Sequence, residues 1–447
     1  MIEQFTVENY RSYQKEEVLS FVASNKEKSG KLSPEWYKEI GGKRILRLLL
    51  CVGLNGTGKS KMFSALNYLR MIATSRPEKP SDRPEYRPFL LDDESRYKSS
   101  ILSLTYYTED KCYYYKVKVS RERVEEEELK DVWENEIVYH RKYNQEKDTV
   151  VIKFGSASDL NKMDQRLLEA NAIQNSTVLS VFGSLNIESR VLRCNYDFFI
   201  ERLSLVRRSE QNLADRLQTD DPDRDRQVKM LLLKLLKDVG TNIVDYFVDD
   251  TSFNVADLIK SGAPEPLIKA MQQQYPSGVI SHKSLRFIHS TAKAGNRDLD
   301  AGLESFGTMN IVRLLVVMYD IVIGRKSSCI DEIETGIHTK ALAFLLKMYL
   351  SIAEDSQIAV ATHDLSLLEH PVLRRDAVRM FEKDENGHTY IKKRVYVHNS
   401  INFLNAYNKE LDPKLDELIE NVQLFIEYRN LIRKMIEEIQ NRKPVKK

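Results

Sequence analysis

The chain has 447 residues, of which 42% are hydrophobic and 30% charged, as expected of a globular protein with a sizeable core. The formal net charge is only +2, so a nucleic-acid site would have to be a local patch. We expect neither a membrane span, because the apolar runs are too short, nor a secretory signal. The four cysteines are dispersed without metal-ligand spacing, which favours a reducing, cytoplasmic location.

Residues 1–155 are expected to form a first α/β lobe. Ile2–Val7 and Val18–Ala23 alternate like an antiparallel strand pair, and the polar residues after them are expected to form a loop. The apolar run Ile45–Val52 is typical of a buried central strand, and Lys61–Ala73 has helical periodicity. Four runs enriched in Tyr and Val predict an antiparallel sheet: Ser100–Tyr107, Cys112–Val119, Glu136–Arg141 and Thr149–Phe154.

Residues 156–280 are expected to be a helical insertion, in which Ser209 would cap one helix. The expected helices are Asp159–Ala172, Ser209–Leu217, Arg226–Val239 and Pro264–Gln274. Arginines in this part of the chain could form a DNA-facing stripe. Because aspartates are interleaved with them, a solvated surface of mixed charge is the favoured interpretation. The arginines are Arg202, Arg207, Arg208, Arg216, Arg224 and Arg226.

Residues 281–400 return to alternating strands and helices and are expected to form a second α/β lobe. The expected elements are strand Leu285–His289, helix Thr308–Ile323, strand Cys329–Ile330, helix Thr339–Ile352, and strands Gln357–Thr362, Val378–Glu382 and Thr389–Val397. Residues 401–447 form a C-terminal segment with a long helix over 412–440. Its apolar stripe, interrupted by Arg429, favours packing on the chain's own core over contact with a partner.

The segment Gly53–Ser60 matches the phosphate-binding pattern G-x-x-x-x-G-K-[ST] in full. The glycines of such a loop allow backbone N–H groups to surround phosphate oxygens. The lysine would place its charge on the β- and γ-phosphates, and the last serine would place a hydroxyl on Mg²⁺. The residues assigned to the nucleotide here are Asn55, Gly56, Gly58, Lys59 and Ser60.

Two carboxylates, Asp331 and Glu332, follow the short strand Cys329–Ile330. Carboxylates at the end of a buried strand are costly unless they meet a cation. Asp331 would hold Mg²⁺ directly or through water, and Glu332 would polarise the attacking water as general base. His363 ends the strand Gln357–Thr362 and fits a γ-phosphate sensor that also orients the water.

Ser305 and Gly307 precede the apolar helix Thr308–Ile323. A serine hydroxyl, a glycine backbone and a helix N-terminus together make an anion-binding end, although an ordinary capped helix has the same pattern. The order of the four elements decides between these interpretations. About one helix separates Ser305 from Asp331, and one helix–strand unit separates Asp331 from His363, so all four can lie at one end of a sheet.

On these motifs the sequence resembles the ABC-type ATPases of the SMC and RecF-like branch, and most closely the small ATPases of bacterial abortive-infection and phage-defence systems. The resemblance covers roughly residues 1–155 and 280–395. Four segments carry the resemblance. Asn9-Tyr10-Arg11-Ser12-Tyr13 is similar to the family's Asn-Phe-Arg-Ser-Phe segment, and Glu304–Thr308 is similar to a shortened signature. Asp331–His338 is similar to a Walker B and D-loop region, and Ala361–Asp364 is similar to the segment with the switch histidine.

The resemblance implies an α/β ABC-ATPase head, in which a mixed sheet with the phosphate loop is joined by an antiparallel β subdomain, a helical insertion and a C-terminal helix. It implies a homodimer or a higher even-numbered oligomer, with each ATP between Lys59 of one subunit and Ser305 of the other. Arg11 either reaches the nucleotide or forms an ion pair on the surface. The signature departs from the Leu-Ser-Gly-Gly-Gln of transporters, and a Q-loop glutamine is not identifiable.

Several functions are consistent with the sequence, among them a purely structural ATP-binding clamp, whereas a transporter subunit is disfavoured. The favoured one is a cytoplasmic ATP-hydrolysing sensor and regulator of an anti-phage system, with a separate effector protein such as a nuclease. The absence of a second catalytic constellation in the sequence favours it. The alternative is a RecF-like DNA repair or recombination ATPase that binds nucleic acid directly.

Overall fold

The computed structural model describes residues 1–23, 34–108, 111–206, 213–254, 259, 262, 264–274, 278–370, 373–392 and 421–441. The chain divides into two compact units. Unit 1 comprises Met1–Arg207, Asp320–Glu334 and Leu342–Lys447, and unit 2 comprises Arg208–Tyr319 and Thr335–Ala341. The predicted cap Ser209, the end of the last predicted strand (393–397) and the first part of the predicted C-terminal helix (412–420) lie outside the described residues.

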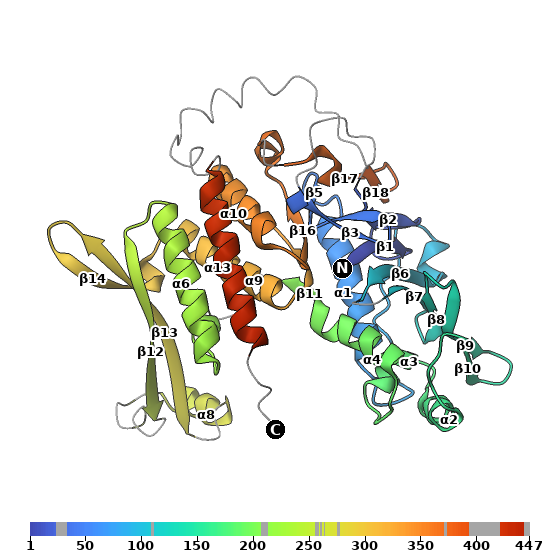
Figure 1. Cartoon of the computed structure of the whole chain (residues 1–447). Coiled ribbons are helices and arrows are strands. Elements are labelled where there is room, and N and C mark those ends of the chain that lie inside the picture. Colours follow the sequence, from blue (N-terminus) through green and yellow to red (C-terminus); the bar gives the residue numbers. More distant parts are fainter. Residues whose placement is uncertain are drawn as a thin grey trace. The chain divides into compact units, whose positions relative to one another are not determined.

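Unit 1 contains the expected antiparallel sheet, which has seven strands (Figure 1). Its order is β10 (Thr149–Phe154), β9 (Glu136–Asn144), β8 (Val124–Asp131), β7 (Cys112–Val119), β6 (Ser100–Tyr107), β1 (Ile2–Glu8) and β2 (Glu17–Ser20). The four strands predicted from Tyr and Val enrichment all belong to this sheet. The prediction missed β8, which lies between two of them.

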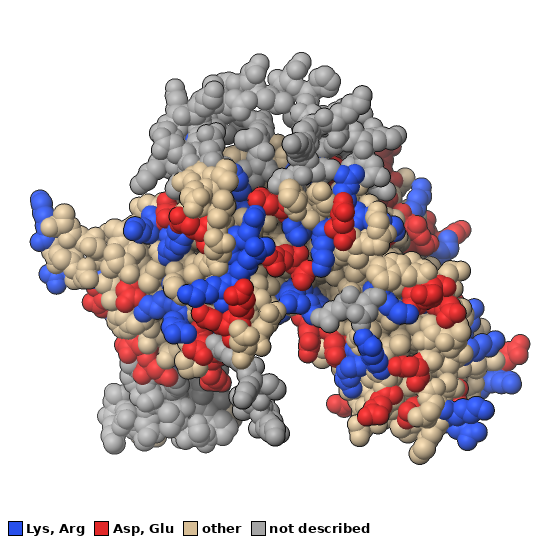
Figure 2. Space-filling model, in the orientation of Figure 1, with Lys and Arg blue, Asp and Glu red and all other residues tan. Residues whose placement is uncertain are grey.

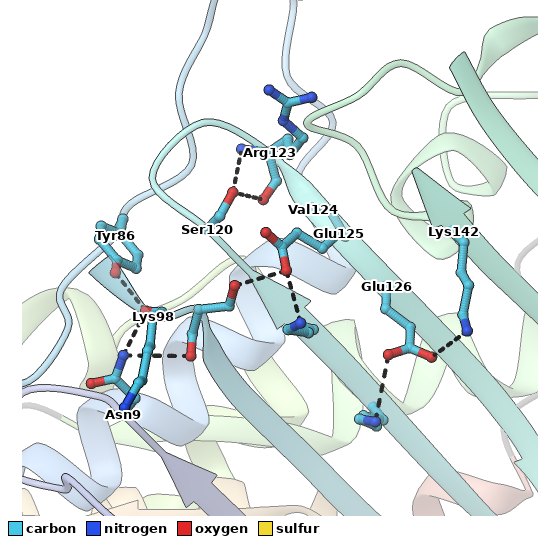
Figure 3. A network of polar contacts seen from close by, with 12 residues as sticks. Asn9, Tyr86, Lys98, Ser120, Arg123, Val124, Glu125, Glu126 and Lys142 are labelled. Atoms are coloured by element: carbon cyan, nitrogen blue, oxygen red, sulfur yellow. Dashed lines mark hydrogen bonds and ion pairs between the residues drawn. The ribbon is translucent and has the colours of Figure 1, made fainter. Parts of the chain in front are cut away.

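The missed strand β8 is rich in glutamate, a residue depleted in strands. Its charges are balanced across the sheet by neighbouring strands. Glu126 lies 3.5 Å from Lys142 of β9, and Glu125 lies 3.0 Å from Lys118 of β7, as Figure 3 shows for the first pair. Such opposite-charge pairs stabilise neighbouring strands on a solvated face. The strand is therefore specified by its neighbours rather than by its own propensity.

The second sheet of unit 1 has six strands in a mixed arrangement. Its order is β11 (Leu203–Val206), β15 (Ser327–Ile330), β16 (Gln357–Thr362), β5 (Leu48–Val52), β17 (Val378–Lys383) and β18 (Thr389–Lys392). The first five strands run parallel, and β18 pairs antiparallel with β17. Every residue of β5, β15 and β16 is buried, which explains their continuous apolar sequences.

The predicted strand Ile45–Val52 is interrupted at Arg47. The residues before it form a hairpin of β3 (Tyr37–Ile40) and β4 (Lys43–Leu46) where a loop was predicted, and the buried strand β5 follows. The Arg47 guanidinium donates to the carbonyl oxygens of Pro34 and Glu35, each at 3.0 Å. These bonds turn the side chain away from the core strand, so one apolar run gives two strands.

The helices of unit 1 include α1 (Lys59–Thr74), which contacts β11 of the mixed sheet and β6 and β1 of the antiparallel sheet. The others are α2 (Lys162–Asn171), α3 (Val178–Phe182), α4 (Arg190–Asp197), the π-helix η3 (Phe198–Arg202), most of α10 (Thr339–Ile352) and α13 (Val422–Gln440). Short 3-10 turns occupy Pro34–Trp36, Ser95–Tyr97, Leu365–Glu369 and Arg375–Ala377.

The C-terminal helix α13 packs on the chain's own core, as the favoured interpretation predicted. Helix α13 lies beside α10 (Figure 1). Phe425 and Tyr428 are buried against Phe344 of α10, with ring centroids 5.5 and 6.4 Å from that of Phe344. Arg429, which interrupts the apolar stripe, donates to the carbonyl oxygen of Ser351 at 2.9 Å. The charged residue therefore contributes a hydrogen bond to the helix it packs against.

Unit 2 combines helices with a three-stranded antiparallel sheet, so the segment predicted to be helical also contains strands. Its elements are α5 (Leu213–Leu217), α6 (Pro222–Asp238), β12 (Ile243–Asn254), α8 (Glu265–Gln274), β13 (Val279–Thr291), β14 (Gly295–Asp300), a 3-10 turn at Ala301–Leu303 and most of α9 (Phe306–Ile323). Tyr246 and Phe287 pack across β12 and β13, and Lys229 of α6 donates to the Tyr246 carbonyl at 2.8 Å. Frequent polar residues in β12 and β14 concealed them from the prediction.

Helix α9 is long and apolar enough to pass for a membrane span by length and composition. However, 61% of that stretch is buried inside the fold. Core helices of globular proteins have the same property, and α9 is accordingly described as a core helix.

Candidate nucleotide site

The phosphate loop lies against the hairpin of β17 and β18. Gly53 has φ of 154°, and a Cβ at this position would lie 2.4 Å from the carbonyl oxygen of Phe381. Gly58 has φ of 105°, and a Cβ there would lie 2.5 Å from Thr389 Oγ1. Both the backbone conformation and the close approach therefore require glycine. Since Gly58 is the N-cap of α1, these contacts fix the N-terminus of that helix.

A second group of contacts holds the loop from the side of residues 9–13. The Tyr13 hydroxyl donates to the Gly58 carbonyl at 2.8 Å, and its ring is fully buried. Thr389 Oγ1 donates to Ser12 Oγ at 2.8 Å, and the Thr389 amide donates to the Ser12 carbonyl at 2.7 Å. The sequence placed Tyr13 in a motif without giving it a role. Its place in the segment Asn9–Tyr13 was the only signal in the sequence that it lies near the phosphate loop.

Hydrogen bonds from Asn9 fix the turn at residues 9–13, and the Asn9 backbone is left-handed with φ of 49°. Its side-chain amide donates to the carbonyl oxygens of Ser95 and Lys98 at 2.8 and 2.6 Å, and its Oδ1 atom accepts from the Phe89 amide at 3.1 Å. Figure 3 shows Asn9 beside Lys98. Asparagine tolerates this conformation better than most residues, which explains its presence at the turn.

Arg11 follows in the same turn. Its guanidinium carbon lies 5.6 Å from the Tyr10 ring centroid, and its buried Nε atom has no hydrogen-bond partner in the described part of the chain. Burial lowers the pKa of Lys61 in the first turn of α1, and the charges of Lys383 and Arg11 lower it further. Within the described residues Arg11 forms no ion pair with a carboxylate. The alternative interpretation as a surface ion pair therefore has no support, and Arg11 stays a predicted nucleotide ligand.

Lys59 is buried at the centre of the loop. Its Nζ atom donates to the carbonyl oxygens of Gly53 and Leu54 at 2.6 and 3.1 Å and lies 3.2 Å from His363 Nδ1. Burial lowers the pKa of Lys59, and the nearby charge of Asp331 opposes this effect. His363 Nδ1 also lies 3.1 Å from the Gly53 carbonyl oxygen, so the Lys59 ammonium and the His363 ring both contact this carbonyl.

Asp331, the predicted Mg²⁺ ligand, and Glu332, the predicted general base, lie at the end of β15. Ile333 donates its amide to the Ala361 carbonyl at 3.1 Å, which extends the pairing of β15 with β16. Glu332 has φ of 48°, a left-handed conformation that residues other than Gly, Asn and Asp rarely adopt. The structure thus brings Lys59, Asp331, Glu332 and His363 to the carboxyl ends of neighbouring parallel strands, which is where ligands bind in open α/β sheets.

The side chains at this edge fit a magnesium ion bound together with a nucleotide. Among the described residues, no group of three or more His, Cys, Asp or Glu side chains is arranged to hold a metal. Mg²⁺ is usually held by one or two carboxylates together with water and substrate phosphates, rather than by a protein cage. Asp331 would supply such a carboxylate, and the exposed Ser60 at the start of α1 would supply a hydroxyl.

Ser305 and Gly307 belong to unit 2. Ser305 Oγ accepts from the Thr308 amide at 3.0 Å, so it caps the start of α9. A Cβ on Gly307 would lie 2.8 Å from the Gly336 carbonyl oxygen, and Asn310 donates to the Thr335 carbonyl at 2.8 Å. The signature-like helix start and the segment after the two carboxylates are therefore packed against each other.

Large apolar side chains next to these motifs are exposed. Leu303 and Phe306, on either side of Ser305, are 72% and 62% exposed, and Leu54 in the phosphate loop is 77% exposed. Single exposed apolar residues are common, but three beside nucleotide motifs suggest contact with another molecule.

Two of the arginines predicted as a potential DNA-facing stripe form ion pairs with aspartates. Arg224 lies 3.2 Å from Asp225, and Arg226 lies 3.3 Å from Asp223. Figure 2 shows basic and acidic side chains interleaved on the visible face. These pairs agree with the interpretation as a mixed-charge surface. Arg207 and Arg208 lie outside the described residues.

Three solved structures similar to the chain are SMC heads. The SMC head domain from Thermotoga maritima has 13% identity and a TM-score of 0.40, and the match covers 89% of this chain and 99% of that one. An Smc head bound to the C-winged helix domain of ScpA has 11% identity and a TM-score of 0.41, with 90% and 99% covered. An Smc head with an extended coiled coil, bound to the C-terminal domain of ScpA derived from Pyrococcus furiosus, has 9% identity and a TM-score of 0.37, with 91% and 99% covered. At these values the likeness carries no argument about function.

A search of curated proteins found no match. A family model matches residues 52–369, more than half of the chain, and its description reads "AAA domain, putative AbiEii toxin, Type IV TA system". The match includes the phosphate loop, Ser305, the carboxylates after β15 and His363. The chain therefore belongs to this family of AAA-domain ATPases linked to AbiEii-type toxin–antitoxin systems.

Proposed function

We propose that the protein binds and hydrolyses ATP with Mg²⁺ and acts as the sensor and regulator of a bacterial anti-phage system of the abortive-infection type. A separate effector protein, such as a nuclease, would carry out the toxic step in the cytoplasm. The observation that carries the proposal is the convergence of Lys59, Asp331, Glu332 and His363 at one edge of a parallel sheet. The family description supports the link to defence.

Each residue at this edge has a chemical role in the proposed reaction. Lys59 would exchange its bonds to two loop carbonyls for bonds to the β- and γ-phosphates. Ser60 and Asp331 would hold Mg²⁺, which neutralises phosphate charge when bound. Glu332 would accept a proton from the attacking water, and His363 would contact the γ-phosphate as its sensor and orient the water. Asn55, Gly56 and Gly58 would supply backbone N–H groups.

The proposed active form is a homodimer, or a higher even-numbered assembly built from it. Ser305 and the Gly307 backbone at the start of α9 would bind the γ-phosphate of an ATP held by Lys59 of the second copy. Support comes from the exposed apolar residues beside both motifs, because burial of such residues stabilises an interface. ATP would close the dimer, and hydrolysis would release it.

The ATPase step is tested with the purified protein. Wild type is expected to release phosphate from ATP in the presence of Mg²⁺, whereas Lys59→Ala loses nucleotide binding. Glu332→Gln is expected to lose turnover but to bind ATP and dimerise more tightly, as measured by light scattering. Lys153→Ala, a change at an exposed lysine of β10, is the matched control and should behave like wild type. Wild type without ATPase activity would overturn the enzymatic proposal.

The biological role is tested separately by expressing the protein with its neighbouring gene and challenging the cells with phage. Protection that is lost in Lys59→Ala is the expected result. If the lone protein instead binds DNA in an ATP-stimulated, salt-sensitive manner and gives no protection, the RecF-like alternative replaces the proposal.

A further inference from the structure

Glu334 lies two residues beyond the proposed general base, and its carboxylate reaches the switch histidine. Its Oε1 atom accepts the backbone N–H of His363 at 2.7 Å. Its Oε2 atom is shielded from solvent and has no hydrogen-bond partner within the described residues. A carboxylate oxygen without partners is costly to bury, so simple packing does not account for this side chain.

The bond from Glu334 ties the turn after β15 to the end of β16. A second tie is the bond from the Ile333 amide to the Ala361 carbonyl. Glu332 lies directly before these ties, and its backbone is left-handed. A residue in a sparsely populated conformation persists only where its surroundings hold it. The two ties therefore fix the Glu332 backbone and the His363 backbone relative to each other.

We propose that Glu334 is a positioning residue, which holds the switch histidine at a fixed place relative to the general base. It acts through the His363 backbone and need not touch the nucleotide. The inference rests on the proposed ATPase function. The negative charge of Glu334 also acts on Lys59, so a test has to separate the loss of charge from the loss of the hydrogen-bond acceptor.

A nucleotide-free measurement tests the contact itself. The chain has eight histidines, so labelling with ¹⁵N-histidine gives few amide signals, and that of His363 is identified by its loss in His363→Ala. Glu334→Ala is expected to accelerate hydrogen exchange of the His363 amide by about tenfold, the equivalent of one lost hydrogen bond. Glu334→Gln retains an oxygen acceptor and should leave exchange nearly unchanged. Equal exchange in wild type and Glu334→Ala would overturn the proposal.

A double-mutant cycle tests the role in catalysis. Glu334→Ala is expected to lower kcat by about 10- to 100-fold, the effect of a small misplacement of a catalytic group. Glu334→Gln should restore most of this loss. Because Glu334 acts through His363, adding Glu334→Ala to His363→Ala should cost nothing more. Additive losses, or a loss in Glu334→Gln as large as in Glu334→Ala, would overturn the proposal.

Two further comparisons distinguish a positioning role of Glu334 from a general structural defect. ATP affinity in a Glu332→Gln background should change less than about threefold on Glu334→Ala, whereas a general structural defect would lower affinity and thermal stability together. If Glu334→Ala does not fold, Glu334→Met keeps the side-chain length without an oxygen acceptor and carries the same expectations. A wild type without ATPase activity would refute the proposed function, while the exchange measurement would still decide the contact.

Discussion

The hydroxyl of Tyr13 offers a direct test of how the phosphate loop is held. Tyr13→Phe removes one oxygen from a fully buried ring and leaves the packing intact. The Gly58 carbonyl, which accepts from this hydroxyl, also accepts from the Lys61 and Met62 amides at 3.0 Å each. The acceptor therefore stays satisfied after the substitution, and the loss is limited to one neutral hydrogen bond.

The expected size of the effect follows from the loss of one neutral hydrogen bond. One buried hydrogen bond contributes about 0.5–1.5 kcal/mol to stability. The loop carries the left-handed Gly58 and is less ordered without this bond, so ATP binding has to restore the order. If most of the loss appears in binding, the Kd for ATP rises about two- to tenfold, since 1.4 kcal/mol corresponds to a factor of ten.

The assay compares Tyr13→Phe with Tyr349→Phe. Tyr349 is also fully buried, and its hydroxyl bonds Ser356 at 3.1 Å, away from the phosphate loop. Urea unfolding without ATP should show a loss of about 1 kcal/mol in Tyr349→Phe and a smaller loss in Tyr13→Phe, because most of the effect of Tyr13→Phe appears in ATP binding. Titration with a fluorescent ATP analogue should show weaker binding in Tyr13→Phe alone. If both variants bind the analogue as wild type does, the hydroxyl is an ordinary core contact and the reasoning fails.

Three other predictions concern the interface, the pH dependence and the antiparallel sheet. A double variant with cysteine at Leu54 and Phe306, in a Glu332→Gln background, should form a disulfide-linked dimer only with ATP; linkage without ATP, or none, contradicts the proposed dimer. Burial lowers the pKa of His388 below 6.5, so the unfolded chain takes up its proton first and stability falls as pH decreases from about 6.5. His388→Gln should therefore flatten the decline of Tm between pH 7 and pH 5, and an unchanged slope counts against this assignment. Glu127 is fully buried, and its carboxylate accepts from the hydroxyls of Tyr115 and Tyr139 and from the amide of Val178. Glu127→Ala should therefore lower the free energy of unfolding in urea by about 3–5 kcal/mol, and Glu127→Gln should lower it less. A loss below about 1 kcal/mol in Glu127→Ala would contradict the reasoning.

The sequence predicted the centre of the fold better than its edges. The strands β5, β15 and β16 are continuous apolar runs because both faces are buried, and this pattern is visible without a structure. The strands β8, β12 and β14 are polar, and they depend on neighbouring strands for their specification. Such tertiary effects override intrinsic propensity, so a single sequence does not reveal them.

In the candidate site, too, some features could be predicted from the sequence and others could not. Lys59, Asp331, Glu332 and His363 were predicted because their spacing follows the motifs, and the structure places them at one sheet edge. The contact of Glu334 with His363 could not be predicted. It depends on the parallel register of β15 with β16 and on the left-handed backbone conformation of Glu332 after β15. Neither feature leaves a pattern in the sequence.

The left-handed backbone at Glu332 sets stability and activity against each other. This conformation costs an ordinary residue about 1–2 kcal/mol, and asparagine adopts it more readily. A selection for thermal tolerance alone would therefore favour Glu332→Asn, which removes the proposed general base. Directed evolution or consensus design that rewards only robust folding should drift towards inactive proteins at this position. A glutamate that is retained at this position during selection for stability would indicate that ATP turnover is also under selection.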